Sequence, residues 1–214
     1  MKLIRQLAVI GLALQAQSTQ PVQYRSCVLD EAITNQGVAD LRRRLLLAIG
    51  ARNVSALQPL VDPGVRYDFG EQGWEGFSRA YQLASSESPM WTQLESDLSH
   101  GGKFVGDDFC APYFMCPTWP GVGDESVLVV LHEGVPIREQ ALATAASIGT
   151  TMCQVITVPA QASWPHVATG WTPVWLSSER WGFVEATHVV MAQTSVRLGR
   201  RGGQWRLVSV LGID

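Results

Sequence analysis

Two cysteines and a histidine are the residues whose types and order could support nucleophilic chemistry. Cys110 precedes a proline that could open a helix, and His132 follows it in the chain, which is the order that a cysteine peptidase needs. A nucleophilic thiolate requires a free cysteine, but Cys116 follows Cys110 closely. The short segment between the two cysteines contains Pro112 to turn the chain, so it favours a disulfide between Cys110 and Cys116.

Other catalytic and metal-binding patterns are not met. His132 and Glu133 begin like a zinc-peptidase motif, but the proline-containing segment that follows cannot continue as one helix. The carboxylates Asp107 and Asp108 are sequence neighbours, whereas a glycosidase holds its two carboxylates across a cleft. We therefore expect a solvated loop at these aspartates and assign no catalytic residue, metal or cofactor.

The start of the chain predicts export. Lys2 and Arg5 precede the apolar run Leu7–Leu14, which is too short to span a membrane comfortably. The segment Ala16–Ser18 offers small residues for cleavage, so residues 1–18 are interpreted as a signal peptide, with an uncleaved anchor as the alternative. We expect a periplasmic or secreted protein without a stable membrane span after cleavage.

The cysteine count agrees with an oxidising compartment, because four cysteines remain after cleavage at that site. If Cys110 pairs with Cys116, then Cys27 and Cys153 could form a second disulfide that ties the N-terminal segment to the later strands. The alternative for Cys153 is a buried apolar thiol on a strand.

Hydrophobic periodicity predicts helices early in the chain and strands later. Apolar residues recur at helical spacing within residues 33–50 and again at 90–98, and shorter helices are expected at 54–60 and 77–84. Strands are expected at 65–69, 126–131, 135–137, 150–158, 171–176 and 181–184. Loops are expected at 99–106 and 110–123. A hairpin is expected to join 195–198 to 205–210.

The strand-rich segment between Val135 and Val190 resembles a bacterial SH3-like (SH3b) domain. It begins with V-P-I-R at Val135–Arg138, continues with C-Q-V-I-T-V at Cys153–Val158, and ends with W-G-F-V at Trp181–Val184. A strand with a leading tryptophan, Trp171–Val174, precedes the last of these. The resemblance implies a small β-barrel that binds peptidoglycan peptide or protein. It covers about a quarter of the chain, and a long insert at 159–170 departs from the family pattern.

A second resemblance concerns the rest of the chain. The closing run G-G-Q-W-R-L-V-S-V at 202–210 is similar to the last strand of α+β domains of the nuclear-transport-factor type, and residues 48–63 are similar to their first helices. We count too few strands for a complete copy. The fold class is therefore predicted as α+β, with an α+β domain at 19–131, an SH3-like barrel at 132–192 and a C-terminal hairpin at 193–214.

Tryptophans in the strand-rich segment are the best candidates for binding. Trp171 and Trp175 point to the same face of one strand, and a small barrel cannot easily bury all of its indoles. We predict a ligand groove that contains these two residues with Arg138 and His166 as polar partners. The alternative is that the indoles only cover the barrel and the domain interface.

These observations favour an exported binding protein that recognises peptidoglycan peptide or an envelope protein. The alternatives are a cell-envelope hydrolase that uses the barrel for targeting, and a purely structural protein. The formal net charge of −3 and the scattered basic residues give no dominant basic patch, so nucleic acid is not expected as a partner.

Overall fold

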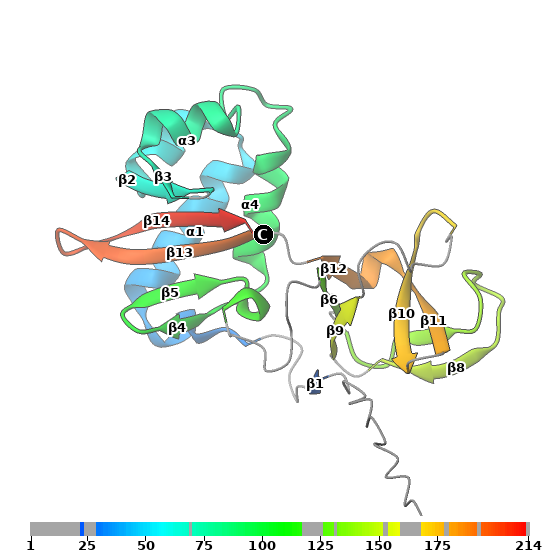
Figure 1. The fold of residues 1–214 in the computed structure, drawn as a ribbon. Helices are drawn as coiled ribbons and strands as arrows, with labels where there is room; N and C mark the ends of the chain where they lie inside the picture. Colours follow the sequence, from blue (N-terminus) through cyan, green and yellow to red (C-terminus); the bar gives the residue numbers. More distant parts are fainter. Residues whose placement is uncertain are drawn as a thin grey trace, which may run out of the picture.

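The computed structural model describes residues 22–23, 29–68, 70–116, 126–130, 132–151, 154–158, 168–177, 180–191 and 194–212. The chain has the predicted mixture of α and β structure, and its strands form one six-stranded and two four-stranded sheets. Figure 1 shows the helices packed against the six-stranded sheet, with the two smaller sheets next to each other beside it. The predicted signal peptide, residues 1–18, lies outside the described residues.

Helix α1 (Gln36–Gly50) follows the apolar stripe seen in the sequence. Asn35 caps it, because its side-chain oxygen accepts hydrogen bonds from the backbone N–H groups of Gly37 and Val38. The buried residues of α1 lie on one side, whereas Arg43 and Arg44 are exposed as a solvated helix face requires.

The other helices are short. They are α2 (Val54–Leu57), α3 (Trp74–Ala80) and α4 (Pro89–Ser99), with 3-10 turns η1 (Glu31–Thr34), η2 (Gln58–Leu60), η3 (Tyr113–Met115) and η5 (Ala186–His188). Helix α4 confirms the helix predicted at 90–98. Helix α3 starts and ends earlier than the predicted range 77–84, because the residues after Ala80 form turns.

The six-stranded sheet has the order β3-β2-β14-β13-β5-β4. Its strands are β2 (Val61–Tyr67), β3 (Glu71–Gln72), β4 (Lys103–Val105), β5 (Asp108–Ala111), β13 (Thr194–Arg201) and β14 (Gln204–Gly212). Strand β14 is parallel to β2, and the other neighbouring strands are antiparallel. The side chains of Val65, Phe109, Leu198 and Leu207 are fully buried and belong to the core that the sheet shares with the helices.

The predicted C-terminal hairpin is present, but it is not a separate unit. Gly202 and Gly203 form its two-residue turn with positive φ angles of 56° and 80°, which glycine adopts without strain. Strands β13 and β14 lie at the centre of the six-stranded sheet. The sequence predicts a separate unit that starts at residue 193, but the hairpin is part of the larger sheet. The reason is that apolar residues such as Val196 and Val210 are buried in the helix-covered core.

Two strands lie where the sequence predicts loops. Strand β4 falls within the predicted loop 99–106, and β5 ends inside the predicted loop 110–123. Both strands are too short to show a clear alternation of apolar and polar residues. Both belong to the six-stranded sheet.

Residues 126–191, together with residues 22–23, build the two four-stranded sheets. One has the order β1-β9-β6-β12 and the other β10-β11-β7-β8. Their strands are β1 (Val22–Gln23), β6 (Ser126–Val130), β7 (Pro136–Arg138), β8 (Ser147–Thr150), β9 (Gln154–Val158), β10 (Trp171–Ser177), β11 (Arg180–Glu185) and β12 (Val189–Met191). The described strands do not pair into a closed barrel. Strand β6 belongs here and not to the preceding domain, because it pairs with β9 and β12.

This strand-rich part interrupts the larger sheet. The chain leaves that sheet at the end of β5 and returns to it at the start of β13, and these two strands pair, with Ala111 opposite Val196. We call residues 117–193 the insertion. The described strands that flank the insertion are therefore neighbours in the larger sheet.

Candidate functional site

The outer side of the β10-β11-β7-β8 sheet brings aromatic residues together. Trp171, Pro173 and Trp175 alternate along β10, and the residues opposite them on β11 are Glu185, Phe183 and Trp181. Residues on one face of a strand pair lie side by side, so these positions share one surface. We call the positions of Arg138, Trp171, Trp175, Trp181 and Phe183 the aromatic face.

Burial identifies the aromatic face as the outer one. Val174 and Val184 occupy the intervening positions of β10 and β11, and their exposed fractions are 1% and 0%. Ile137 of β7 is also buried, at 4%. These buried aliphatic residues thus form the core of the insertion, and the opposite face of the sheet points outward.

The exposed part of the aromatic face includes Trp171, Trp181 and Phe183, which are all half-buried. Pro173 between the tryptophan positions is buried. A surface of this kind presents indole and phenyl edges to a partner while part of each ring stays packed. Such rings lose little side-chain entropy on binding, which is why aromatic residues are enriched at the centres of interfaces.

Arg138 lies on the aromatic face through the pairing of β7 with β11, which sets it opposite Phe183. Its Nη1 donates a hydrogen bond of 3.1 Å to the backbone oxygen of Ala145, so it also holds the loop between β7 and β8. A guanidinium group has five N–H donors, which leaves donors for a ligand carboxylate or carbonyl.

The structure brings two of the four predicted ligand residues, Arg138 and Trp171, to one face, and the backbone register places the position of Trp175 on the same face. The side chain of Trp175 and the whole of His166 lie outside the described residues. Sequence analysis did not include Trp181 and Phe183 among the ligand residues. The alternation in W-G-F-V already contained this signal, because residues two apart on a strand share a face.

The predicted disulfide between Cys110 and Cys116 is present, with a Cα–Cα distance of 5.6 Å. Cys27 and Cys153 lie outside the described residues. Because the Cys110 sulfur is bonded and the residue is fully buried, it cannot act as a thiolate with His132. His132 instead packs edge to face on His188, with 5.7 Å between ring centroids.

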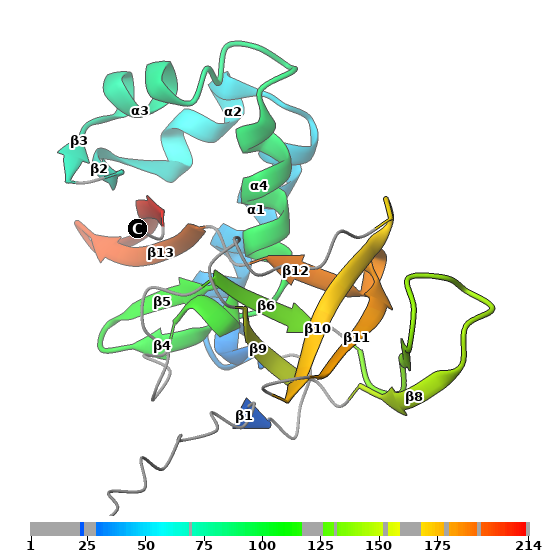
Figure 2. The same ribbon diagram turned by 45° about the vertical axis from the view of Figure 1, so that its right-hand side comes forward.

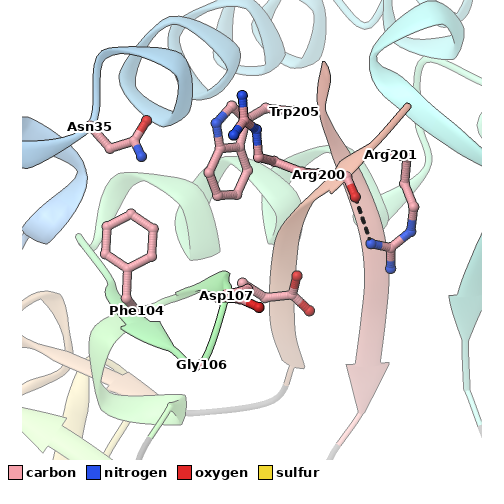
Figure 3. A pocket seen from close by; sticks show the side chains of 8 residues that line it. Asn35, Phe104, Gly106, Asp107, Arg200, Arg201 and Trp205 are labelled. Atoms are coloured by element: carbon pink, nitrogen blue, oxygen red, sulfur yellow. Dashed lines mark hydrogen bonds between the residues drawn. The ribbon is translucent and has the colours of Figure 1, made fainter. Parts of the chain in front are cut away.

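A pocket that sequence analysis did not predict lies at one end of the six-stranded sheet (Figure 3). Its volume is about 710 Å³. Its lining consists of Asn35, Phe104, Gly106, Asp107, Asp108, Arg200, Arg201 and Trp205. The rings of Phe104 and Trp205 meet edge to face, with centroids 6.2 Å apart, and form its apolar wall.

The charged residues of this pocket do not form a hydrolytic centre. Asp107 lies in the turn between β4 and β5, Asp108 is the first residue of β5, and the other charged lining residues are Arg200 and Arg201. Glycoside hydrolysis needs two carboxylates that face each other across a cleft. The described lining contains no further carboxylate opposite the two aspartates. In the parts of the chain that the structure describes, no three His, Cys, Asp or Glu residues are grouped to hold a metal ion.

No protein-family model matches the chain, and no curated protein matches it. Among the described helices, none is both long and apolar enough to cross a membrane. The disulfide between Cys110 and Cys116 fits a protein of an oxidising compartment.

Proposed function

We propose that the protein is an exported binding protein, periplasmic or secreted, whose insertion recognises cell-wall peptide or an envelope protein through the aromatic face. The observation that carries this proposal is the register of β10, β11 and β7, which gathers the positions of three tryptophans, a phenylalanine and Arg138 on one outer surface. The resemblance to SH3b domains supports the choice of ligand, because it implies peptide recognition by strands in this order.

The chemistry of the aromatic face suits an extended peptide. Half-buried indole and phenyl rings such as those of Trp171 and Phe183 can pack on the aliphatic parts of a peptide. Arg138 can donate two parallel hydrogen bonds to a terminal or side-chain carboxylate. Wall peptides carry both kinds of group, so we take them as the first ligand to test.

The hydrolase alternative finds no support among the described residues. Cys110 is engaged in a disulfide, and the two other charged residues in the pocket lined by Asp107 and Asp108 are the arginines Arg200 and Arg201. The proposal therefore assigns binding to the insertion and names no catalytic residue.

The test is retention on insoluble peptidoglycan that has been stripped of anionic polymers. We expect the purified protein to sediment with it and the Trp171→Ala, Phe183→Ala double variant to stay in solution. A control variant, Ile33→Ala with Leu47→Ala, removes apolar groups that are 82% and 64% exposed on the other part of the chain. This control should be retained like the wild type.

Two results would contradict the proposal. If the wild-type protein is not retained, peptidoglycan peptide is not the ligand. If a folded double variant, judged by its near-ultraviolet circular dichroism, is retained as well as the wild type, the aromatic face does not bind the wall.

A further inference from the structure

The side of the six-stranded sheet that faces away from the helices is rich in basic residues. Val196 and Leu198 of β13 are buried in the helix-covered core, so the alternating positions of Arg197 and Arg201 face the other way. Figure 1 shows α1, α3 and α4 behind the sheet and none of these helices in front of β13 and β14.

The strand register aligns these residues with others from distant parts of the sequence. Lys103 and Arg197 each pair with Cys110, and Arg197 pairs with Ser209, which in turn pairs with Arg66. One row thus crosses the sheet in the order Lys103, Cys110, Arg197, Ser209, Arg66. Because neighbouring strands are about 4.8 Å apart, successive cations in this row are about 10 Å apart.

Further cations flank the row. Arg206 pairs with Gly199 on the same face, and Arg201 lies two residues along β13 from Gly199. Asp108 is the one carboxylate among the described paired residues whose side chains lie on this face. Its Oδ1 lies next to Gly199. We call Arg66, Lys103, Arg197, Arg201 and Arg206 the basic face.

The cations of the row itself have no ion-pair partner among the described residues. The Ser209 hydroxyl, which lies between Arg197 and Arg66, is fully buried and has no hydrogen-bond partner in the described structure. Buried polar groups are normally hydrogen-bonded, so an orphan hydroxyl between two guanidinium groups needs an explanation. Because this hydroxyl has no access to solvent, an anionic oxygen drawn between Arg197 and Arg66 would become its partner only after the side chains that cover it move aside.

We propose that the basic face binds a linear polyanion that carries repeated phosphate groups. A row of separated cations matches charges repeated along a flexible chain. The row offers no aromatic residue on which nucleic-acid bases could stack, and no large apolar side chain that could insert into a bilayer. Strand β13, which contributes the central cation of the row, is curved along its length (Figure 2).

This inference goes beyond the proposed recognition of wall peptide and concerns a different surface. The sequence shows no dominant basic patch, because these cations are spread from Arg66 to Arg206 and converge only through strand pairing. The two surfaces can be tested independently.

The experiment measures the binding of fluorescently labelled inorganic polyphosphate by anisotropy at several salt concentrations. The test variant carries Arg66→Gln, Lys103→Gln and Arg197→Gln. The matched control carries Arg43→Gln, Arg44→Gln and Arg79→Gln, which remove three exposed cations from helices α1 and α3. Both triple variants change the net charge equally, so a difference between them reports position and not total charge.

We expect the wild type and the control to bind, and the test variant to lose about tenfold or more in affinity. Each phosphate contact contributes about −0.7 to the slope of log affinity against log salt for a flexible single strand, so the slope should flatten by about 2. The Trp171→Ala, Phe183→Ala variant should bind polyphosphate normally, which separates this inference from the proposed function.

The inference is overturned if the wild type fails to bind polyphosphate at low salt, or if both triple variants lose affinity equally. It is also overturned if vesicles containing anionic phospholipid bind tightly while polyphosphate does not, because the basic face would then recognise a membrane surface.

Discussion

Asp97 is a buried carboxyl group that joins helix α4 to the strand by which the chain returns from the insertion. It is 3% exposed, accepts a 2.8 Å hydrogen bond from Gln93 Nε2, and also accepts one from the Thr194 hydroxyl. Burial raises the pKa of Asp97 to about 7, although both hydrogen bonds act in the opposite direction. Folding therefore favours the protonated form of the Asp97 carboxyl group over the ionised form, relative to the unfolded chain.

The pKa of Asp97 predicts how stability depends on pH. The pKa of Asp97 is higher in the folded state than in the unfolded state. Its contribution to the free energy of unfolding is therefore fully present below pH 3.8 and is lost as the pH rises towards 7. We expect Asp97→Asn to match the wild type near pH 4 and to exceed it at pH 8. The upper bound of the gain is about 4 kcal/mol for a shift of this size.

Urea unfolding at both pH values measures this difference, and Asp107→Asn, which changes an exposed carboxyl group, should alter neither value. The assignment would be wrong if Asp97→Asn destabilised the protein at pH 8 as much as at pH 4.

The disulfide gives a second prediction at the scale of residues. Replacing both Cys110 and Cys116 by serine removes a constraint on the unfolded chain that closes a short loop, with a sequence separation of 6. Loop-closure entropy for such a loop predicts a loss of about 2 kcal/mol. Denaturant unfolding of the double variant checks this value, and adding reductant to the variant should cause no further loss from this pair.

At this scale the sequence was most informative where partners are close in the chain. Cys110 and Cys116 could be paired from their spacing, and Arg138 and Trp171 could be selected from their residue types. The carboxyl group of Asp97 could not be recognised, because its burial depends on packing against Thr194, far away in the sequence.

Among the elements, α1 and β14 meet at a position where only a glycine fits. A Cβ atom added to Gly37 would lie 2.5 Å from Cδ1 of Trp205, well inside contact distance. By contrast, a Cβ added to Gly50 at the other end of α1 would meet no atom within 4 Å.

This contrast predicts opposite outcomes for the same chemical change. Gly37→Ala should destabilise the protein by about 1–3 kcal/mol, because Trp205 must move to admit the methyl group. Gly50→Ala should be neutral or stabilise by up to about 1 kcal/mol, because alanine favours the helix. Thermal unfolding followed by tryptophan fluorescence tests both, and equal effects would contradict the close contact between α1 and β14.

The long helices and the hairpin were predictable because their signals are local. Apolar spacing marks α1, and the glycine turn at 202–203 marks the hairpin. Strands β4 and β5 were missed because three or four residues do not display a period. Strand β5 pairs with β13, which is distant in the sequence, and β4 in turn pairs with β5.

For the whole molecule, the insertion is the feature that sequence analysis could not place. The boundaries predicted at 131 and 193 follow changes in pattern along the chain. The structure shows that the segments on either side belong to one sheet, because β5 pairs with β13 across the insertion. Such pairing of distant segments leaves no local pattern in the sequence.

The insertion should therefore be removable. Replacing residues 117–193 by a short Gly-Ser linker joins two neighbouring strands whose separation is set by the paired Ala111 and Val196. We expect the shortened chain to unfold cooperatively and to keep its helical circular dichroism. Loss of cooperative unfolding would show that the six-stranded sheet depends on the insertion.

Peptidoglycan retention of this shortened chain, compared with the full chain, tests the central claim most directly. We predict that the full protein is retained and that the folded, shortened chain remains in solution, because the aromatic face has been removed. Equal retention of both chains would contradict the account and would assign wall binding to the six-stranded sheet and its helices.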